Sequence, residues 1–366
     1  MRRWGIADPR RARCYRRRRM LPAPPLPDTR PTISIVQVEH ILQGARRQGL
    51  DVARILAQAG LSPALLAAPL SRVSQAQYAS LIRVLRRTTR DEFWGLCNRA
   101  VPVGTFGECC RLLVHCGNLG AALRTGFRYY HRVLPDFVAR LVVERGLAHL
   151  RLHTRGEADG RLDYAERVFM FFSFGLGSWL VARRIPVAQV NYAGPPPPQA
   201  NDTARVFGAP VRYEQPYTGF SIEARWLELP VVQNTQSLAE FLRLAPANLI
   251  VRYRDRTSLT ERTRQLLRGE LHGELPTLEE VGRRLAVPPQ TLRRRLREEG
   301  QGFQALKDDL RRDAAIEYLA RPDLTLMDIA AQLGFSEAST FHRAFKKWTG
   351  VAPGEYRQSH GPRGTG

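Results

Sequence analysis

The chain has few cysteines, and their spacing matches no known metal site. Its 366 residues include five cysteines, which are Cys14, Cys97, Cys109, Cys110 and Cys116. The group CCRLLVHC invites a metal or redox interpretation, because Cys109 and Cys116 would share one helical face beside His115. No zinc pattern has this spacing, so small, buried and inert side chains on an amphipathic helix explain it better. An odd number of cysteines without a secretion signal predicts reduced thiols in a cytoplasm, with no metal and no cofactor.

Long hydrophobic runs are also missing. The uncharged and mainly apolar stretch at residues 168–182 has 15 residues, whereas a transmembrane helix needs about 20. We expect this stretch to form a core helix or to line an apolar pocket, and we expect no membrane partner. The first 30 residues lack the apolar segment of a secretory signal. Their arginines and prolines indicate that this segment is disordered, or that translation really starts nearer Met20. A third alternative is an arm that contacts DNA.

The sequence motifs of common enzymes are missing too. The chain contains no Gly-x-Ser-x-Gly, no phosphate loop and no zinc signature. A DNA-repair alkyl acceptor would need a motif such as Pro-Cys-His-Arg, and an amidotransferase-like protein would need a cysteine on a glycine-flanked elbow. Cys97 follows FWGL without that geometry. We therefore predict that the protein is not an enzyme.

What the sequence does contain is one pattern twice, within residues 276–357. The copies read TLEEVGRRLAVPPQTLRRRLREEG and TLMDIAAQLGFSEASTFHRAFKKWTG. Thr277 recurs as Thr325 at an offset of 48, and Leu292 recurs as Phe341 at an offset of 49. An offset that changes only at the turn and at the helix end is typical of a duplicated helix-turn-helix unit. One copy alone would be compatible with a plain helical hairpin, but two matching copies favour a protein that reads two stretches of DNA groove.

The second copy carries the chemistry of helix ends. Thr325 with Asp328 three residues later predicts a capping box. Gly334 suits a helix end that turns into the left-handed conformation. We expect Ser336 or Ser339 to cap the helix that follows.

Both copies predict a buried apolar edge on their second helix. In the second copy Phe341, Phe345 and Trp348 recur at helical spacing. In the first copy Leu292 and Leu296 form the equivalent edge. These edges would pack each second helix against the rest of its unit.

The first copy follows the pattern more loosely. Ala286 stands where the second copy has Gly334, and Pro289 suits the first turn of a helix. Gly282 and Pro288 are unusual at their positions, so we expect the second helix of this copy to be less rigid.

The C-terminal residues identify a family resemblance. The run LGFSEASTFHRAFKKWTGVAPGEYR resembles the signature of the AraC/XylS family of bacterial transcription regulators. The run FQALKDDLRRDAAIEYLARPDLTLMDIA resembles the connecting helix of that family. The resemblance implies an all-α domain with two helix-turn-helix motifs joined by a helix, and double-stranded promoter DNA as partner. It also implies RNA polymerase as a partner and a cytoplasmic, nucleoid-associated location.

Charge by itself does not locate the DNA site. The net charge is +22, but residues 1–20 hold nine arginines against Asp8, and residues 256–366 hold 19 basic and 15 acidic residues. A charged stretch on a helix is usually a solvated face. On a recognition helix, contacts to phosphates and bases are the better interpretation.

The faces opposite the apolar edges are therefore the candidate DNA contacts. In the first copy the resemblance places base contacts at the same positions. The predicted base contacts are Gln290, Arg293, Arg294, Ser339, Thr340, His342 and Arg343. The predicted phosphate contacts are Thr291, Arg297, Lys346 and Lys347. A pH switch at His342 is an alternative, but a surface hydrogen bond to DNA is the simpler role.

The first two thirds of the chain mix helix and strand patterns. DFVARLVVERGLAHLRLHTR predicts two strands with a turn at Arg145 and Gly146. VAQVNYAG predicts another strand, and VRYEQPYTGFSIEARWLELP predicts two short strands around residues 215–219. Together with amphipathic helices, this predicts a mixed α/β domain, and the whole chain is expected to be an α+β multidomain protein.

This region resembles the arabinose-binding-like regulatory domain of some AraC-type regulators, similar to ornithine-utilisation and virulence regulators. The residues that carry it include AGLSPALLAAPLSRVSQAQYASLIRVL and FWGLCNRAVPVGTFGECCRLLVHCGNLGAAL. The resemblance implies an effector, but no polar cluster suited to a sugar is present. Aromatic stretches suit a hydrophobic or amphipathic effector and equally a plain core. The candidate pocket residues are Phe171, Phe174 and Trp179.

These observations predict five segments. A disordered Arg/Pro-rich start (1–31) precedes an effector-binding and dimerisation domain (32–240) and a linker (241–257). A double helix-turn-helix DNA-binding domain (258–360) precedes a disordered tail (361–366). We expect a transcription regulator controlled by an unknown small-molecule effector and able to form a homodimer. The alternative is a constitutive DNA-binding protein whose N-terminal domain only dimerises.

Overall fold

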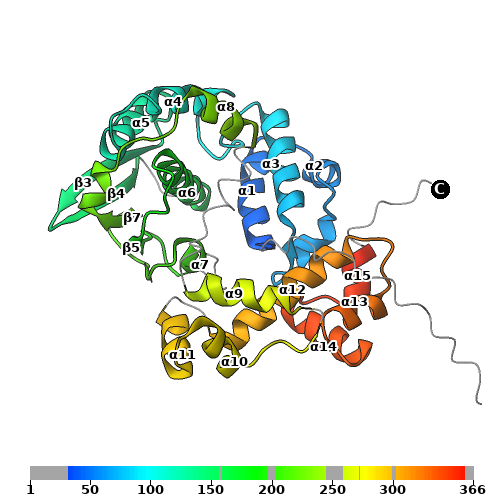
Figure 1. Cartoon of the computed structure of the whole chain (residues 1–366). Coiled ribbons are helices and arrows are strands. Elements are labelled where there is room, and N and C mark those ends of the chain that lie inside the picture. The colour runs from blue at the N-terminus through cyan, green and yellow to red at the C-terminus, as the bar shows by residue number, and fades with distance from the viewer. Residues whose placement is uncertain are drawn as a thin grey trace, which may run out of the picture.

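The structure is a computed structural model that describes residues 32–155, 159–196, 203–244, 259–271, 273–298 and 302–358. Within these residues a mixed α/β N-terminal part precedes an all-α C-terminal part (Figure 1). The predicted fold class is confirmed. The predicted disordered start and tail, Cys14 and residues 245–257 of the predicted linker lie outside the described residues.

The N-terminal part begins with a helical layer beside a two-stranded ribbon. The elements are β1 (Ile33–Ser34), α1 (Ile35–Arg47), α2 (Val52–Gln58), η2 (Pro63–Ala67), β2 (Arg72–Val73) and α3 (Gln75–Thr89). In α1 the buried residues Ile35, Val38, Ile41 and Leu42 recur every three or four positions, which gives the helix one apolar face. Gly49 follows α1 with φ of 68°, so the helix ends where the glycine predicts.

A five-stranded sheet has the order β3-β4-β7-β5-β6. Its strands are β3 (Phe137–Glu144), β4 (Leu147–Thr154), β5 (Val187–Asn191), β6 (Val211–Arg212) and β7 (Thr218–Glu223). The predicted strands are confirmed, and the β3–β4 turn lies at Arg145 and Gly146, with φ of 51° and 77°. The β5–β6 pair is parallel, and the other pairs are antiparallel.

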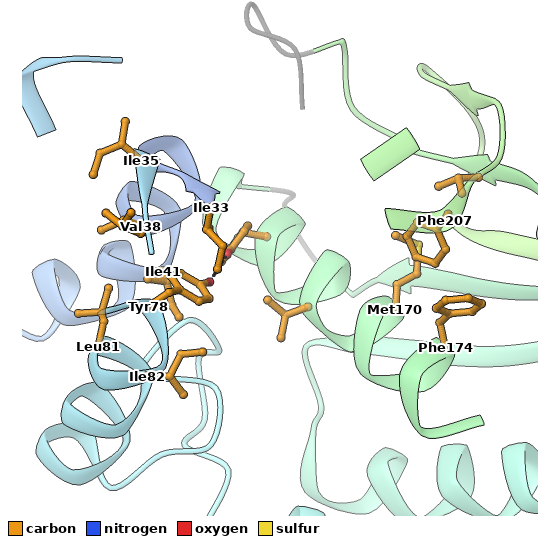
Figure 2. Close-up of a cluster of buried hydrophobic side chains, with 14 of the residues drawn as sticks. Ile33, Ile35, Val38, Ile41, Tyr78, Leu81, Ile82, Met170, Phe174 and Phe207 are labelled. Carbon is orange, nitrogen blue, oxygen red and sulfur yellow. Dashed lines mark hydrogen bonds between the residues drawn. The ribbon is translucent and has the colours of Figure 1, made fainter. Parts of the chain in front are cut away.

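Helix α6 (Gly160–Leu180) runs between this sheet and the helical layer (Figure 1). Asp159 caps its first turn by accepting a hydrogen bond from the Leu162 backbone N–H at 2.7 Å. Met170 and Phe174 are buried on its sheet-facing side with Phe207 (Figure 2). Both alternatives for the uncharged run at 168–182 hold for the residues within α6, which form a core helix and also, through Phe169, Phe172 and Leu176, line an apolar pocket.

The remaining elements of the N-terminal part pack around α6 and the sheet. They are α4 (Thr105–Leu113), α5 (Leu119–Val133), α7 (Thr203–Phe207), η3 (Ala224–Glu228) and α8 (Thr235–Leu244). Cys109 and Cys110 are buried on α4, and burial raises the pKa of the Cys109 thiol to about 12. The prediction that Cys109 and Cys116 share a helical face is wrong, because α4 ends at Leu113 and Cys116 follows in a turn.

The described residues of the C-terminal part form helices and no strands. The helices are α9 (Leu259–Gly269), α10 (Leu278–Leu285), α11 (Pro289–Glu298), α12 (Phe303–Leu319), α13 (Leu326–Gln332), α14 (Ala338–Thr349) and α15 (Pro353–Gln358). Across the described ranges, none of the helices combines the length and apolar character that crossing a bilayer requires. The same residues contain no group of three or more His, Cys, Asp or Glu side chains placed to hold a metal ion.

Candidate nucleic-acid interface

The two sequence copies fold as two helix-turn-helix units. The first unit contains α10 and α11, the second contains α13 and α14, and α12 connects them (Figure 1). Both units begin with the same N-terminal capping motif. Thr277 and Glu280 form a capping box at α10, with N–H···O distances of 2.7 and 3.2 Å. Thr325 forms the predicted box with Asp328 at α13, with distances of 2.9 and 3.1 Å.

The turns of the two units use the same backbone conformation with different residues. Gly334 has φ of 74° and Ala286 has φ of 54°. Gly334 is also required by packing, since a Cβ atom there would collide with the Gly273 carbonyl oxygen. At Gly282 a Cβ atom would lie 2.8 Å from the Val287 carbonyl oxygen. The unusual glycine of the first unit therefore permits close packing between α10 and the turn.

One predicted cap is wrong. The N-cap position of α14 is occupied by Glu337 and has no side-chain cap. Ser339 lies inside the first turn, and its hydroxyl donates to the Glu337 carboxylate at 2.9 Å. Because α14 starts at Ala338, Ser336 lies too early to cap it and Ser339 lies too late.

The apolar edges of the second helices are buried as predicted. Leu292 and Leu296 in α11, and Phe341 and Phe345 in α14, are fully buried. The aromatic rings of Phe341 and Phe345 lie 5.7 Å apart, and Trp348 packs half-buried against Phe335. Each recognition helix is thus fixed by one edge, which orients the opposite edge outward.

The predicted DNA-contacting residues lie on those outward sides. The exposed ones are Gln290, Arg293, Arg294, Arg297, Ser339, Arg343, Lys346 and Lys347. Half-buried are Thr291, Thr340 and His342. Arg295 is also exposed, but at 100° per residue it lies on the opposite flank of the Leu292–Leu296 edge from Arg293 and Arg297.

The connecting helix is packed along its length. α12 has 17 residues and buries Leu306, Leu310 and Ile316. The Lys307 ammonium donates to the carbonyl oxygens of Leu275 and Pro276 at 3.0 and 3.2 Å. These contacts hold α12 against the entry to the first unit.

The three candidate pocket residues lie in packed aromatic contacts. Phe171 stacks on Phe207 with ring centres 5.0 Å apart, and Phe174 contacts Phe207 at the same distance. Trp179 stacks on Phe241 of α8 at 4.1 Å.

Two adjoining cavities lie elsewhere around α6. The inner cavity, about 40 Å³, lies among α4, α5 and α6; the outer cavity, about 200 Å³, opens toward α3 and α8. Phe93 and Phe172 line both cavities, whereas none of the three candidate residues lines either. The sequence reasoning also missed Arg86 and Glu92, which line the outer cavity, because no motif marks them.

Comparison with known proteins identifies the family that has this architecture. A model described as the arabinose-binding domain of AraC transcription regulators matches residues 49–231, half of the chain, and a helix-turn-helix model matches residues 281–359. The chain therefore belongs to the AraC family of transcription regulators, and it is a DNA-binding transcription regulator.

Individual relatives agree with this family. The ornithine utilization regulator of Pseudomonas aeruginosa is 28% identical over 336 residues, which cover 92% of this chain and 99% of that protein. The regulator VirS of Mycobacterium tuberculosis is 34% identical over 158 residues, 43% of this chain and 46% of VirS. The solved regulator CdpR from Pseudomonas aeruginosa has a TM-score of 0.30 and 20% identity, over 88% of this chain and 98% of CdpR.

Proposed function

We propose that the protein recognises promoter sequence by placing α11 and α14 in successive segments of one major groove. The observation that best supports this is the shared arrangement of both helices, with one apolar edge buried and the candidate contacts on the outward side. The 17 residues of α12 span about 25 Å. With the offset that each unit adds, this length suits groove segments about 34 Å apart.

The proposed contacts divide into two classes. Gln290, Arg293, Arg294, Ser339, Thr340, His342 and Arg343 read base edges, and Thr291, Arg297, Lys346 and Lys347 bind phosphates. An arginine can donate two hydrogen bonds to the O6 and N7 atoms of guanine, which makes it the most selective of these side chains.

The N-terminal part is proposed to bind a small-molecule effector and to dimerise. Residues 32–240 would form this domain and 258–360 the DNA-binding domain, with the linker between them. Support comes from the relative named for ornithine utilization, which aligns over nearly its whole length. A ligand regulates only if it binds two states of the protein differently. The regulator would act in the cytoplasm, on nucleoid DNA, together with RNA polymerase.

The second candidate is a constitutive DNA-binding protein whose N-terminal domain only dimerises. Both functions use the same DNA-binding surface, so the effector response separates them. Thermal unfolding and promoter affinity of the full chain would be measured with and without candidate metabolites. If no metabolite changes either quantity, the dimerisation-only alternative stands.

Sequence recognition is tested with the full chain and a pool of random duplexes. After selection, hydroxyl-radical footprinting should show two protected backbone segments one helical turn apart. Enrichment of no common sequence, or protection of a single segment, would contradict recognition by both helices.

A further inference from the structure

The inner cavity offers an apolar environment. Its walls come from α4, α5 and α6 and include Phe106, Leu113, Phe127, Phe169 and Leu176. None of the residues that line it is charged, and Ser173 on α6 supplies a hydroxyl. Burying a charged group in such a place without a partner is strongly unfavourable. The inner cavity therefore suits the apolar body of a ligand.

The outer cavity adds two ionisable side chains, Arg86 and Glu92. The Glu92 carboxylate already accepts hydrogen bonds from the backbone N–H groups of Gly104 and Phe106, at 2.8 and 2.7 Å. It is therefore engaged in holding the start of α4. Burial raises the pKa of the Glu92 carboxyl, and these two backbone donors oppose that shift.

The surroundings of Arg86 differ from those of Glu92. Its side chain is half-buried on α3, beside the outer cavity. In the part of the chain that the structure describes, its guanidinium makes no hydrogen bond or ion pair, and it interacts with Glu92 only through longer-range electrostatics. A planar guanidinium with free donors suits a carboxylate, which it can bind through two parallel hydrogen bonds.

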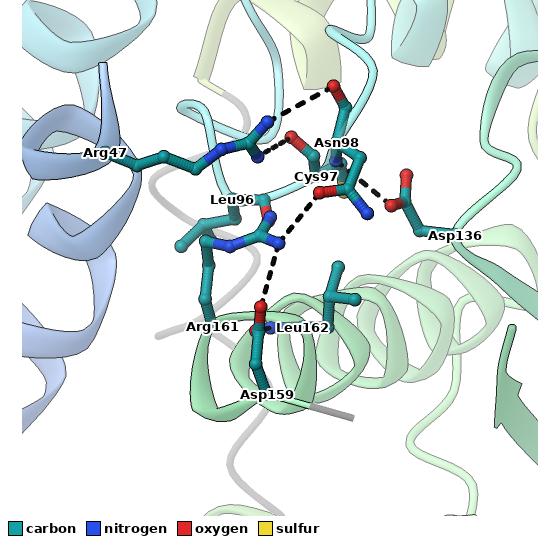
Figure 3. A network of polar contacts seen from close by, with 8 residues as sticks. All are labelled: Arg47, Leu96, Cys97, Asn98, Asp136, Asp159, Arg161 and Leu162. Carbon is teal, nitrogen blue, oxygen red and sulfur yellow. Dashed lines mark hydrogen bonds and ion pairs between the residues drawn. The ribbon is translucent and has the colours of Figure 1, made fainter. Parts of the chain in front are cut away.

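The wall of the outer cavity is fixed by polar contacts behind it. Phe93 and Trp94, which line the cavity, lead into a segment whose carbonyl and amide groups are held by two arginines (Figure 3). Arg47 donates to the Cys97 carbonyl oxygen at 2.8 Å, and Arg161 donates to the Asn98 side chain at 2.9 Å. Such a wall is preorganised, which lowers the cost of ordering it around a ligand.

We propose that the two cavities form one effector site, which takes a carboxylic acid with an apolar body. The body would occupy the inner cavity and the carboxylate would bind Arg86 in the outer one. This inference rests on the proposed effector control and specifies its ligand class. It excludes a diamino acid such as ornithine, because a second, cationic group would have to enter an apolar space.

The site also contacts the helix that leads toward the DNA-binding part. Leu242 of α8 lines the outer cavity, and its neighbour Phe241 contacts Phe106 at 6.3 Å and stacks on Trp179. Among the described elements, α8 is the last one before α9. A ligand that moves Leu242 would therefore shift α8 and change its contacts with α4 and α6.

The experiment uses the full chain and probes that share one body. 4-Phenylbutyrate, 4-phenylbutan-1-ol and 4-phenylbutylamine differ only in the head group, and ornithine is the fourth probe. Isothermal titration calorimetry with wild-type protein should show that the carboxylate binds more tightly than the alcohol, and that the amine and ornithine do not bind. Tighter binding of the amine or ornithine, or no binding of the carboxylate, would overturn the inference.

Matched variants locate the head group. Arg86→Gln should weaken carboxylate binding by at least about tenfold and leave alcohol binding unchanged. Arg87→Gln is the control, because its side chain is exposed on the next position of α3 and lines neither cavity. Ser173→Phe should fill the inner cavity and abolish binding of both probes. Equal carboxylate affinities for Arg86→Gln and Arg87→Gln would overturn the head-group assignment.

The same titrations separate this inference from the proposed function. Promoter affinity is measured with and without saturating 4-phenylbutyrate. Arg86-dependent binding with no change in promoter affinity supports the site and contradicts effector control. A promoter response to ornithine that persists in Ser173→Phe supports effector control and overturns the site.

Discussion

Thr32 and Asp313 are joined by a hydrogen bond of 2.5 Å between their side-chain oxygens, although 281 positions separate them in the sequence. Thr32 directly precedes β1, and Asp313 lies in the middle of α12. Both residues are buried. Arg72 of β2 donates to the Thr32 hydroxyl at 2.8 Å, and Asp313 also binds Arg312 at 3.2 Å. The start of the N-terminal part is therefore bound to the helix that connects the two DNA-binding units.

Neighbouring contacts extend this attachment to the second unit. The Tyr356 hydroxyl of α15 donates to the Arg72 carbonyl oxygen. The Ser71 hydroxyl donates to the Thr349 carbonyl oxygen at the end of α14, at 3.3 Å. In this arrangement the β1–β2 ribbon and the residues just before its strands contact α12, α14 and α15, of which α14 belongs to the second unit. A structural change in the ribbon would thus act on α14 directly and on α11 only indirectly.

Replacing Thr32 by valine should weaken this attachment. Valine keeps the shape but removes the donor to Asp313 and the acceptor for Arg72, so buried polar groups lose their partner. We expect a loss of about 1–3 kcal/mol in the free energy of unfolding. Hydrogen–deuterium exchange should rise in both β1 and α12.

Ser34→Ala is the control for this change. The Ser34 hydroxyl accepts a hydrogen bond from the Val36 backbone N–H at 3.3 Å and caps α1, so its loss affects stability without touching α12. Exchange should then rise in α1 alone. If both variants gave the same exchange pattern in α12, the Thr32–Asp313 contact would not couple the two parts.

Base reading in the first unit depends on Arg294. Arg294→Ala should cost about 1–3 kcal/mol of binding free energy and relax the preference at one base pair. Arg295→Ala is the matched control, since that side chain is also exposed but points about 100° away from Arg294, on the flank opposite Arg293 and Arg297. Gel-shift titrations with single-base variants of the selected site measure both effects. Unchanged affinity and preference in Arg294→Ala would refute the assignment.

The helix-turn-helix units could be predicted because their residues follow short, repeated rules. Thr325 with Asp328, Gly334, and the spacing of Phe341 and Phe345 are local signals, and each is found in the structure. The N-cap of α14 escaped prediction, because Ser336, Glu337 and Ser339 lie within four positions. Packing of the helix decides which of them precedes its first turn.

The particular residues of α6 that line the cavity escaped prediction for a different reason. α6 is buried on several sides, so its apolar residues carry no periodicity that distinguishes the packed side from the hollow one. Phe171 and Phe174 lie against Phe207, whereas Phe172 lines the cavities. The Thr32–Asp313 contact could not be predicted, because no local sequence pattern relates two residues that lie so far apart in the chain.

Phosphate contacts in the second unit should be insensitive to sequence. Lys347→Ala should weaken binding to all duplexes alike and reduce the slope of log affinity against log salt by about one unit. Arg343→Ala provides the contrast, because a base contact changes the preference at one position. Competition titrations across a range of salt concentrations separate the two. A changed sequence preference in Lys347→Ala would show that this lysine contacts a base.

The turns of the two units predict opposite effects of exchanging alanine and glycine. Gly334→Ala should destabilise the protein, because φ of 74° is strained for alanine and the new Cβ atom meets the Gly273 carbonyl. Ala286→Gly should stabilise it by up to about 1 kcal/mol, because the left-handed conformation costs alanine about that much. Thermal unfolding of the two variants measures the sign of each effect. Equal shifts in one direction would mean that backbone strain does not govern these turns.

The connecting helix should act as a spacer whose integrity both units need. Ala314 is fully buried in the middle of α12, and proline there removes a backbone hydrogen bond and disturbs the preceding turn, at a cost of about 3 kcal/mol or more. The kink would change the distance and angle between α11 and α14, so DNA binding should be lost although Ala314 is not among the proposed DNA contacts. Gln304→Pro is the control, because this exposed residue lies in the first turn of α12, where proline is tolerated. Circular dichroism checks that both variants remain folded, and footprinting reports the groove segments. Protection of both segments by folded Ala314→Pro protein would mean that the rigid spacing of α12 is not what positions the two recognition helices.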